Sequence, residues 1–160
     1  MKKLKIYLDT CVVGYLDQAD DPERMRDTQI LWDEIQAGLY DVVISDLALA
    51  EIDRCHESRR AVLANHLALI DFEQVIVTPP IKTLAQVFID QNILTMKSED
   101  DCRHIACAMY YGCDVIVSWN FKHFVNHRTI HGVKIVSAIT GYNSVSIYSP
   151  TMLIGGDQDD

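Results

Sequence analysis

Short apolar runs that alternate with segments of helical spacing constrain the fold of this chain most strongly. The runs are rich in β-branched residues and are predicted to be strands: Leu4–Leu8, residues 41–45, residues 74–78, Val115–Val117 and residues 133–136. Continuous apolar strands that alternate with helices are typical of a parallel sheet covered by helices on both faces. We therefore predict the α/β class, as a three-layer α/β/α sandwich with a mainly parallel central sheet.

The segments between these runs show apolar residues at helical spacing. Helices are predicted over residues 22–37, 47–54, 59–70 and 81–91, and over a further segment that follows residues 98–101 and ends at Gly112. Asp46 is a candidate N-cap for the second of them. Ser98, with Asp101 three residues later, resembles a capping box at the start of the last one.

The 160-residue chain contains no internal repeat and no low-complexity linker. We therefore expect a single domain over residues 1–150, followed by an acidic, disordered tail over residues 151–160. The sequence contains no run of ~18 apolar residues, so we expect no membrane span. The five cysteines include no CxxC pair. They therefore favour free thiols in a reducing cytoplasm over a disulfide framework.

The net charge of −9 limits the classes of ligand that the surface can bind. With 23 acidic and 14 basic residues, the protein lacks the cationic excess that tracks a nucleic-acid backbone by displacing counterions. An acidic protein can still cleave RNA if its acids are gathered around metal ions. We therefore expect any RNA binding to be local.

Acidic residues recur where predicted strands end and helices begin. Asp9 follows the first strand, Glu51 lies about two helical turns after the second, and Asp100 and Asp101 open a later helix. Ligands collect beyond the carboxyl ends of parallel strands, and Mg²⁺ prefers oxygen ligands. Taken singly, these acids could end a strand, lie on a solvated helix face or complement a helix dipole. Together they predict a site for a hard cation.

Four ordered segments resemble the motifs of PIN-domain proteins, which include the toxin ribonucleases of type II toxin–antitoxin pairs. The segments are residues 6–13 (Ile-Tyr-Leu-Asp-Thr-Cys-Val-Val), 45–52 (Ser-Asp-Leu-Ala-Leu-Ala-Glu-Ile), 101–106 (Asp-Cys-Arg-His-Ile-Ala) and 114–124 (Asp-Val-Ile-Val-Ser-Trp-Asn-Phe-Lys-His-Phe). The resemblance extends from residue 4 to about residue 148. It implies a PIN-like fold and a metal-dependent endoribonuclease.

The resemblance also implies roles for particular residues. It implies that Asp9 and Asp101 are the principal ligands of one or two Mg²⁺ or Mn²⁺ ions. It also implies that Glu51 is a ligand, either directly or through a water molecule. The cation activates a water for phosphodiester hydrolysis. Many relatives carry a fourth acid where this chain has Asn120, which keeps an oxygen ligand but loses a charge. Cys11 stands where many relatives have Asn or Ser.

Further residues are expected to contact the substrate. Asn120, with Ser118 or Thr10, would orient a ligand water or the phosphate, and Lys122 and Arg54 are the first candidates for phosphate contacts. The resemblance also implies an RNA substrate, a small antitoxin protein as partner, and a homodimer.

The histidines have competing interpretations. His123, His127 and His131 repeat every four residues and could line one helical face as a transition-metal cluster, although hydrated surface histidines are more common. His104 lies three residues after Asp101, on the same helix face. It could support the site as a partner of a ligand, or it could be a hydrogen-bonded core histidine.

Other functions compete with the nuclease interpretation. A phosphatase of the haloacid-dehalogenase type needs a second acid two residues after Asp9, where this chain has Cys11. A Rossmann cofactor domain needs a glycine-rich turn after the first strand, which is absent here. The serious rival is a PIN-like domain that is catalytically weak or inactive and binds a protein partner or RNA without cutting it.

Overall fold

Five short apolar runs pair into one parallel sheet in a computed structural model that describes residues 3–154. The strands are β1 (Leu4–Leu8), β2 (Tyr40–Ser45), β3 (Glu73–Val75), β4 (Val115–Val117) and β5 (Ser146–Tyr148). Their order across the sheet is β3-β2-β1-β4-β5, and every neighbouring pair is parallel. The predicted three-layer α/β/α fold is therefore confirmed, with a sheet that is parallel throughout.

Strand β1 lies in the centre of the sheet because Ile6, Tyr7 and Leu8 are all buried. The chain first adds β2 and β3 on one side of β1 and then crosses to add β4 and β5 on the other. The point where the strand order reverses lies between β1 and β4, at their carboxyl ends. Crevices at such a point are where open α/β sheets bind ligands.

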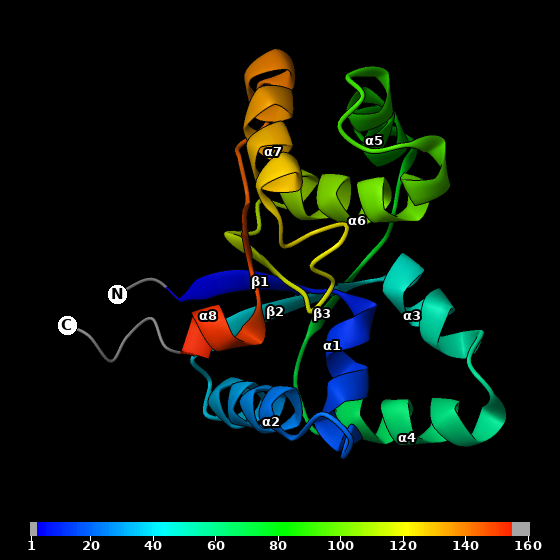
Figure 1. Cartoon of the computed structure of the whole chain (residues 1–160), viewed down its shortest axis with the longest axis vertical. Helices are drawn as coiled ribbons and strands as arrows, with labels where there is room; N and C mark the ends of the chain where they lie inside the picture. Colours follow the sequence, from blue (N-terminus) through cyan, green and yellow to red (C-terminus); the bar gives the residue numbers. More distant parts are fainter. Residues whose placement is uncertain (1–2, 155–160) are drawn as a thin grey trace.

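Eight α-helices within residues 3–154 cover the two faces of the sheet (Figure 1). One face carries α5 (Pro79–Asp90), α6 (Glu99–Tyr110) and α7 (His127–Thr140). The other carries α1 (Thr10–Gly14), α2 (Pro22–Gln36), α3 (Asp46–Asp53), α4 (Glu57–Leu67) and α8 (Pro150–Ile154). Two 3-10 turns, Tyr15–Asp17 and Met96–Ser98, complete the described part.

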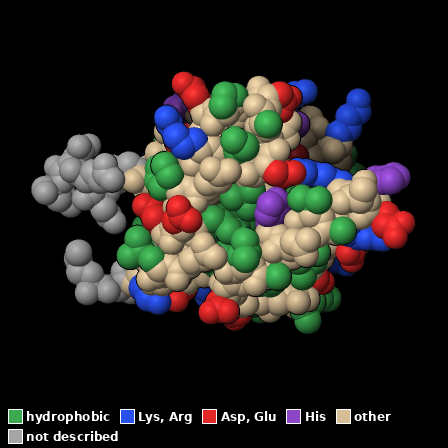
Figure 2. All heavy atoms as spheres, turned by 90° about the horizontal axis from the view of Figure 1, so that it is seen from below, with side chains coloured by type: hydrophobic (Ala, Val, Ile, Leu, Met, Phe, Trp, Pro, Cys, Tyr) green, Lys and Arg blue, Asp and Glu red, His purple; other side chains and the backbone are tan. Residues whose placement is uncertain are grey.

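Each face of the sheet has its own apolar core. Because side chains alternate along a strand, Tyr7 and Ile116 pack with α5, α6 and α7. Ile6, Leu8 and Val117 pack with the helices of the opposite face. Figure 2 shows that opposite face from the side of α2 and α4, with hydrophobic side chains along its middle and charged ones toward its edges.

The longest helices begin and end at the signals expected of them. Asp21 accepts a hydrogen bond from the Arg24 N–H at the start of α2, where Pro22 is the first helical residue. Asn126 caps α7 in the same way, through the Thr129 N–H, and Gly141 ends that helix with φ 81°. The Asn126 cap therefore ends the loop that runs from the end of β4 to the start of α7.

The strand predicted over residues 133–136 is wrong, because these residues lie within helix α7. Val133 and Val136 are both fully buried, which is the one-turn spacing of a helix facing the core. Gly132, at the same level of the helix, lies so close to Ile93 that an added Cβ would come within 2.4 Å of its Cγ2. Helix packing therefore overrides the β-branched run, and the fifth strand comes later, at Ser146–Tyr148.

The two predicted capping arrangements differ from the structure: Asp46 is not the N-cap of α3, and Ser98 is the N-cap residue of α6 but does not form a capping box. The N-cap of α3 is Ser45, whose hydroxyl accepts the Ala48 N–H, whereas Asp46 is the first helical residue and accepts the Val77 N–H instead. Ser98 precedes α6, but within the described residues its side chain makes no capping hydrogen bond and lies 3.3 Å from a nitrogen of His123. Tertiary partners therefore take both side chains away from local capping.

The C-terminal segment continues the fold beyond the predicted boundary at residue 150. Residues 151–154, which the sequence analysis assigns to the tail, lie in α8, where Leu153 packs into the core beneath the sheet. The predicted tail residues 155–160 lie outside the described residues. All five cysteines are free thiols. Helices long and apolar enough to cross a membrane are absent from residues 3–154.

Candidate metal centre

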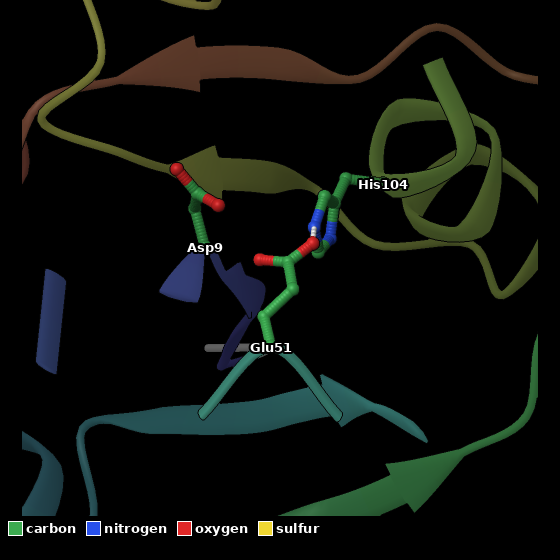
Figure 3. A group of neighbouring side chains, drawn as sticks. All are labelled: Asp9, Glu51 and His104. Atoms are coloured by element: carbon green, nitrogen blue, oxygen red, sulfur yellow. Dashed lines mark hydrogen bonds and ion pairs between the residues drawn. The ribbon is translucent and has the colours of Figure 1, made fainter. Parts of the chain in front are cut away.

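Three elements bring Asp9, Glu51 and His104 together at the carboxyl end of β1 (Figure 3). Asp9 directly follows β1, Glu51 lies in α3 and His104 lies in α6. One ligand atom from each of the three lies within 4.8 Å of the other two. Asp9 is 5% exposed and His104 1% exposed. Two of the three side chains are therefore buried, and Glu51 is partly exposed.

Two neutral donors fix one carboxylate oxygen of Asp9. The Ser118 hydroxyl donates to Oδ2 at 2.8 Å, and the Cys11 thiol donates to the same oxygen at 3.0 Å. Ser118 directly follows β4, next to β1 in the sheet. Burial raises the pKa of Cys11 well above its usual range, and the negative charge of Asp9 raises it further. The thiol therefore stays protonated as a donor and leaves Oδ1 free for another partner.

Both oxygens of Glu51 are also held. The Thr10 hydroxyl donates to Oε2 at 2.6 Å, and Nε2 of His104 lies 2.7 Å from Oε1. Burial acts to raise the pKa of Glu51, but the hydrogen bond and charge of His104, the hydrogen bond of Thr10 and the charge of Arg54 together lower it. Glu51 is therefore a carboxylate at neutral pH, with its orientation set from two sides.

His104 continues this contact into the core through a relay of hydroxyls. Its Nδ1 lies 2.5 Å from the Tyr7 hydroxyl, which lies 2.7 Å from the Ser45 hydroxyl. Burial acts to lower the pKa of His104, but the hydrogen bond with Glu51 and the charge of Asp9 raise it. A histidine whose second ring nitrogen has a fixed partner presents the first in a defined orientation. The relay therefore fixes the side of the imidazole that faces the acids.

Asp101 lies near this group but outside it. The carboxylate is 3.7 Å from Nδ1 of His123. The pKa of Asp101 is raised, first by burial and then by the negative charges of Asp9 and Glu51, against the opposing effect of His123. Its neighbour Asp100 is exposed and pairs with Arg103 instead. Of the two neighbours Asp100 and Asp101, Asp101 is therefore the one that interacts electrostatically with Asp9 and Glu51.

The structure gives Asn120 a structural contact. Its Oδ1 accepts the His123 N–H at 3.0 Å, and its own N–H donates to the Ser118 hydroxyl. These contacts fix the turn after β4. Lys122 lies exposed in the same loop, beside a hollow lined in part by Ser98 and His123. The ligand role of Asn120 and the phosphate contacts of Lys122 and Arg54 stay predictions.

The histidine repeat does not form a metal cluster within the described residues. His127 and His131 stack on α7 with ring centroids 6.0 Å apart, whereas His123 precedes that helix and contacts Asp101 and Ser98. His104 combines the two roles weighed for it, because it is a buried core residue that also pairs with Glu51. Tyr7 and Ser45 are not predicted from the sequence, since a tyrosine in an apolar strand and a serine at the end of a strand carry no functional signal.

Comparisons with known proteins support the fold. No model of a known family matches the chain, and no curated protein matches its sequence. VapBC2 from Rickettsia felis, solved bound to a DNA fragment from its promoter, is 12% identical with a TM-score of 0.56, over 91% of this chain and 98% of that one. VapC20 from Mycobacterium tuberculosis, a toxin that cleaves the sarcin-ricin loop, is 19% identical with a TM-score of 0.53, over 69% and 86%. The chain therefore has the PIN-like fold of these structures, the fold that its four sequence motifs predict.

Proposed function

We propose that this protein is a metal-dependent endoribonuclease that hydrolyses RNA phosphodiester bonds. The observation that carries the proposal is the convergence of Asp9, Glu51 and His104 at the carboxyl end of the central strand. Asp101 adds a third acid whose pKa is raised partly by the charges of the other two. Neighbouring carboxylates raise one another's pKa and disfavour the charged forms unless a cation offsets the repulsion. The site therefore favours a bound cation, because the positively charged side chains nearby offset the negative charge of these acids only in part.

The donor set fits Mg²⁺ or Mn²⁺. Asp9, Glu51 and Asp101 supply hard oxygen ligands, whereas both ring nitrogens of His104 already have partners in Glu51 and Tyr7, so His104 orients Glu51 rather than binding the ion. Bound there, such an ion would lower the pKa of a water and neutralise charge on the phosphate. In this proposal Asp9 and Asp101 are the principal ligands. Glu51 is a ligand directly or through water.

The surrounding residues of this chain orient the ligands. Ser118 and Cys11 both donate to Oδ2 of Asp9 and thereby fix the orientation of its carboxylate. Thr10 and His104 each form a hydrogen bond with a different oxygen of the Glu51 carboxylate. Asn120 fixes the loop after β4 and thereby the hydroxyl of Ser118. Lys122 and Arg54 are the cations of this chain proposed to meet the RNA phosphates.

The proposal extends to the biological setting. A cytoplasmic, homodimeric toxin of a toxin–antitoxin pair, neutralised by a small antitoxin protein, agrees with the resemblance of the motifs. It also agrees with the shared fold, since VapC20 is a toxin that cleaves the sarcin-ricin loop. We propose that the whole activity lies in one domain, the one predicted over residues 1–150 and extended by helix α8 to Ile154.

The test is an RNA cleavage assay with a matched pair of variants. Labelled structured and unstructured RNAs are incubated with Mn²⁺, Mg²⁺ or EDTA and the wild type, Asp9→Asn or Asp71→Asn. Asp71 is an exposed acid just before β3, so its substitution removes the same charge at the opposite end of the sheet. Wild type and Asp71→Asn should cleave with either metal, and Asp9→Asn should not. Cleavage by Asp9→Asn at the wild-type rate contradicts the proposal.

A second candidate function is binding of RNA or a protein partner without cleavage. It is favoured by Asn120, which replaces an acid and uses its oxygen to fix a turn, and by the net charge of −9. Titration of Mn²⁺, followed by calorimetry, separates the two functions. Tight binding by the wild type that is lost in Asp9→Asn supports the nuclease. Equal, weak binding by both proteins supports the alternative.

A further inference from the structure

A cation and three aromatic rings form a cluster beside the candidate metal centre. The guanidinium carbon of Arg24 lies 5.7 Å from the ring centroid of Tyr15, 5.2 Å from that of Trp119 and 5.0 Å from that of Phe121. The Trp119 ring centroid is 5.7 Å from that of Tyr15 and 6.2 Å from that of Phe121. We call these four residues the Arg24 cluster. Such cation–π contacts are attractive and hold the guanidinium against the ring faces.

Hydrogen bonds make the Arg24 cluster rigid. Trp119 is 6% exposed, and its indole N–H donates to the Thr28 hydroxyl at 2.9 Å. That hydroxyl in turn donates to the carbonyl oxygen of Arg24. The Arg24 guanidinium donates to the Tyr15 hydroxyl at 3.3 Å and pairs with Asp21 at 3.5 Å. A ligand that used this surface would therefore meet groups that are already ordered.

Both segments that supply the metal centre lead directly into the cluster. Trp119 follows Ser118, whose hydroxyl donates to Asp9. Tyr15 follows helix α1, which begins at Thr10, a donor to Glu51. The cluster is thus joined to both sides of the acid group by a few residues of fixed backbone. The rings therefore lie within a few residues of the acids along two separate segments.

Phe121 is exposed although its partners are ordered. The residue is 42% exposed, and its backbone is fixed in the turn after β4, where the carbonyl oxygen of Asn120 accepts the N–H groups of Phe124 and Val125. A ring whose purpose was core packing would be buried with Trp119. Phe121 instead presents apolar surface to solvent next to a guanidinium plane. Aromatic and guanidinium planes together are what unstacked nucleobases stack on.

We propose that the Arg24 cluster binds an unpaired nucleobase of the RNA substrate, next to the phosphate that is cleaved, with the base stacked on Phe121. This inference rests on the proposed nuclease function and specifies its substrate as RNA with unpaired nucleotides at the cut. Stacking also answers the difficulty of the net charge, because a base gains affinity from a ring face without the broad cationic surface that phosphates require.

The experiment measures RNA affinity and cleavage for two substitutions of one ring. Phe121→Leu keeps an apolar side chain but removes the ring, whereas Phe121→Trp keeps a ring. Tyr110→Leu removes an aromatic side chain of similar exposure (39%) at the last residue of α6, the end of that helix opposite to Asp101. A short, mixed-sequence, single-stranded RNA with a fluorescent label is bound to each variant in an Asp9→Asn background, which prevents cleavage. The same RNA is then used with single abasic positions.

Phe121→Leu should bind the RNA about tenfold more weakly, as expected for the loss of one stacked base. Phe121→Trp and Tyr110→Leu should bind like the parent protein. One abasic position should weaken the parent by a similar factor and should add little to Phe121→Leu, because both changes remove the same contact. Equal affinity of Phe121→Leu and the parent, or full additivity at every abasic position, overturns the stacking site.

The failure of this inference is distinguishable from the failure of the proposed function. With Asp9 restored, metal-dependent cleavage that is equal in wild type and Phe121→Leu, in KM as well as in kcat, leaves the nuclease standing and refutes the stacking site alone. RNA that is neither bound nor cleaved by the wild type refutes both. A raised KM in Phe121→Leu that Phe121→Trp restores supports both.

Discussion

The Tyr7 hydroxyl is the link through which the core orients the metal centre, and its removal has a calculable cost. Tyr7→Phe keeps the fully buried ring and creates almost no cavity, but it removes the contacts with His104 (2.5 Å) and Ser45 (2.7 Å). Ser45 retains the Ala48 N–H, whereas Nδ1 of His104 loses its partner in a buried position. An unsatisfied buried polar group costs about 1–3 kcal/mol. We therefore expect the free energy of unfolding to fall by about 2 kcal/mol.

Thermal unfolding followed by circular dichroism, with EDTA present, measures this loss. For a domain of this size about 2 kcal/mol lowers the midpoint temperature by about 4–8 °C. Tyr110→Phe is the matched control, because Tyr110 is partly exposed and surface substitutions change stability by about 0.5 kcal/mol or less. Equal midpoints for Tyr7→Phe and Tyr110→Phe would show that the hydroxyl does not bridge His104 and Ser45. The reasoning about the relay would then be refuted.

Three further predictions concern the core and the site. Gly132→Ala should lower the free energy of unfolding in urea by about 1–3 kcal/mol, since its Cβ would lie 2.4 Å from Ile93; an unchanged urea midpoint would refute this packing. Ser118→Ala removes one of the two donors to Asp9 and should weaken Mn²⁺ binding in calorimetry about tenfold; unaltered affinity would mean that the Cys11 thiol suffices. In the metal-free protein the ion pair between His104 and Glu51 should stabilise the fold, since the pKa of His104 is raised and that of Glu51 is lowered. This stabilisation is lost as the pH rises through the folded-state pKa of His104. It is also lost as the pH falls through the folded-state pKa of Glu51. The stability difference between wild type and Glu51→Gln in EDTA should therefore peak between these two pKa values, and a difference that is constant with pH would contradict the pairing.

The sequence predicts the sheet and the class of fold well because strand burial dominates local preference. Leu4–Leu8 and Val115–Val117 lie at the centre of a parallel sheet, where continuous apolar residues have no other stable environment. Residues 133–136 are also rich in β-branched residues, yet they form a helix. The decisive contact is the close approach of Gly132 to Ile93, 39 positions away in the chain, and no local sequence pattern predicts it.

For the site, the sequence predicts which acids approach one another but not what holds them. The position of Asp9 after an apolar strand and of Glu51 two turns into a helix follows from topology. The contacts of Cys11, His104 and Tyr7 depend on side-chain directions that only the folded core determines. The capping role of Asn120 is hidden for the same reason, since an asparagine in a loop can bind a ligand or cap a turn.

The wide separation of the site residues along the chain has a consequence for how the protein is made. The hydrogen bond between Ser118 and Asp9 joins residues 109 positions apart, at the ends of neighbouring strands that are the first and the fourth of the five along the chain. At about 5–20 residues per second of synthesis, roughly 5–20 s pass between the two residues leaving the ribosome. A growing chain therefore carries its first acids for seconds before β4 can dock and complete the centre. The proposed active site therefore forms only after Ser118 has left the ribosome and β4 has paired with β1.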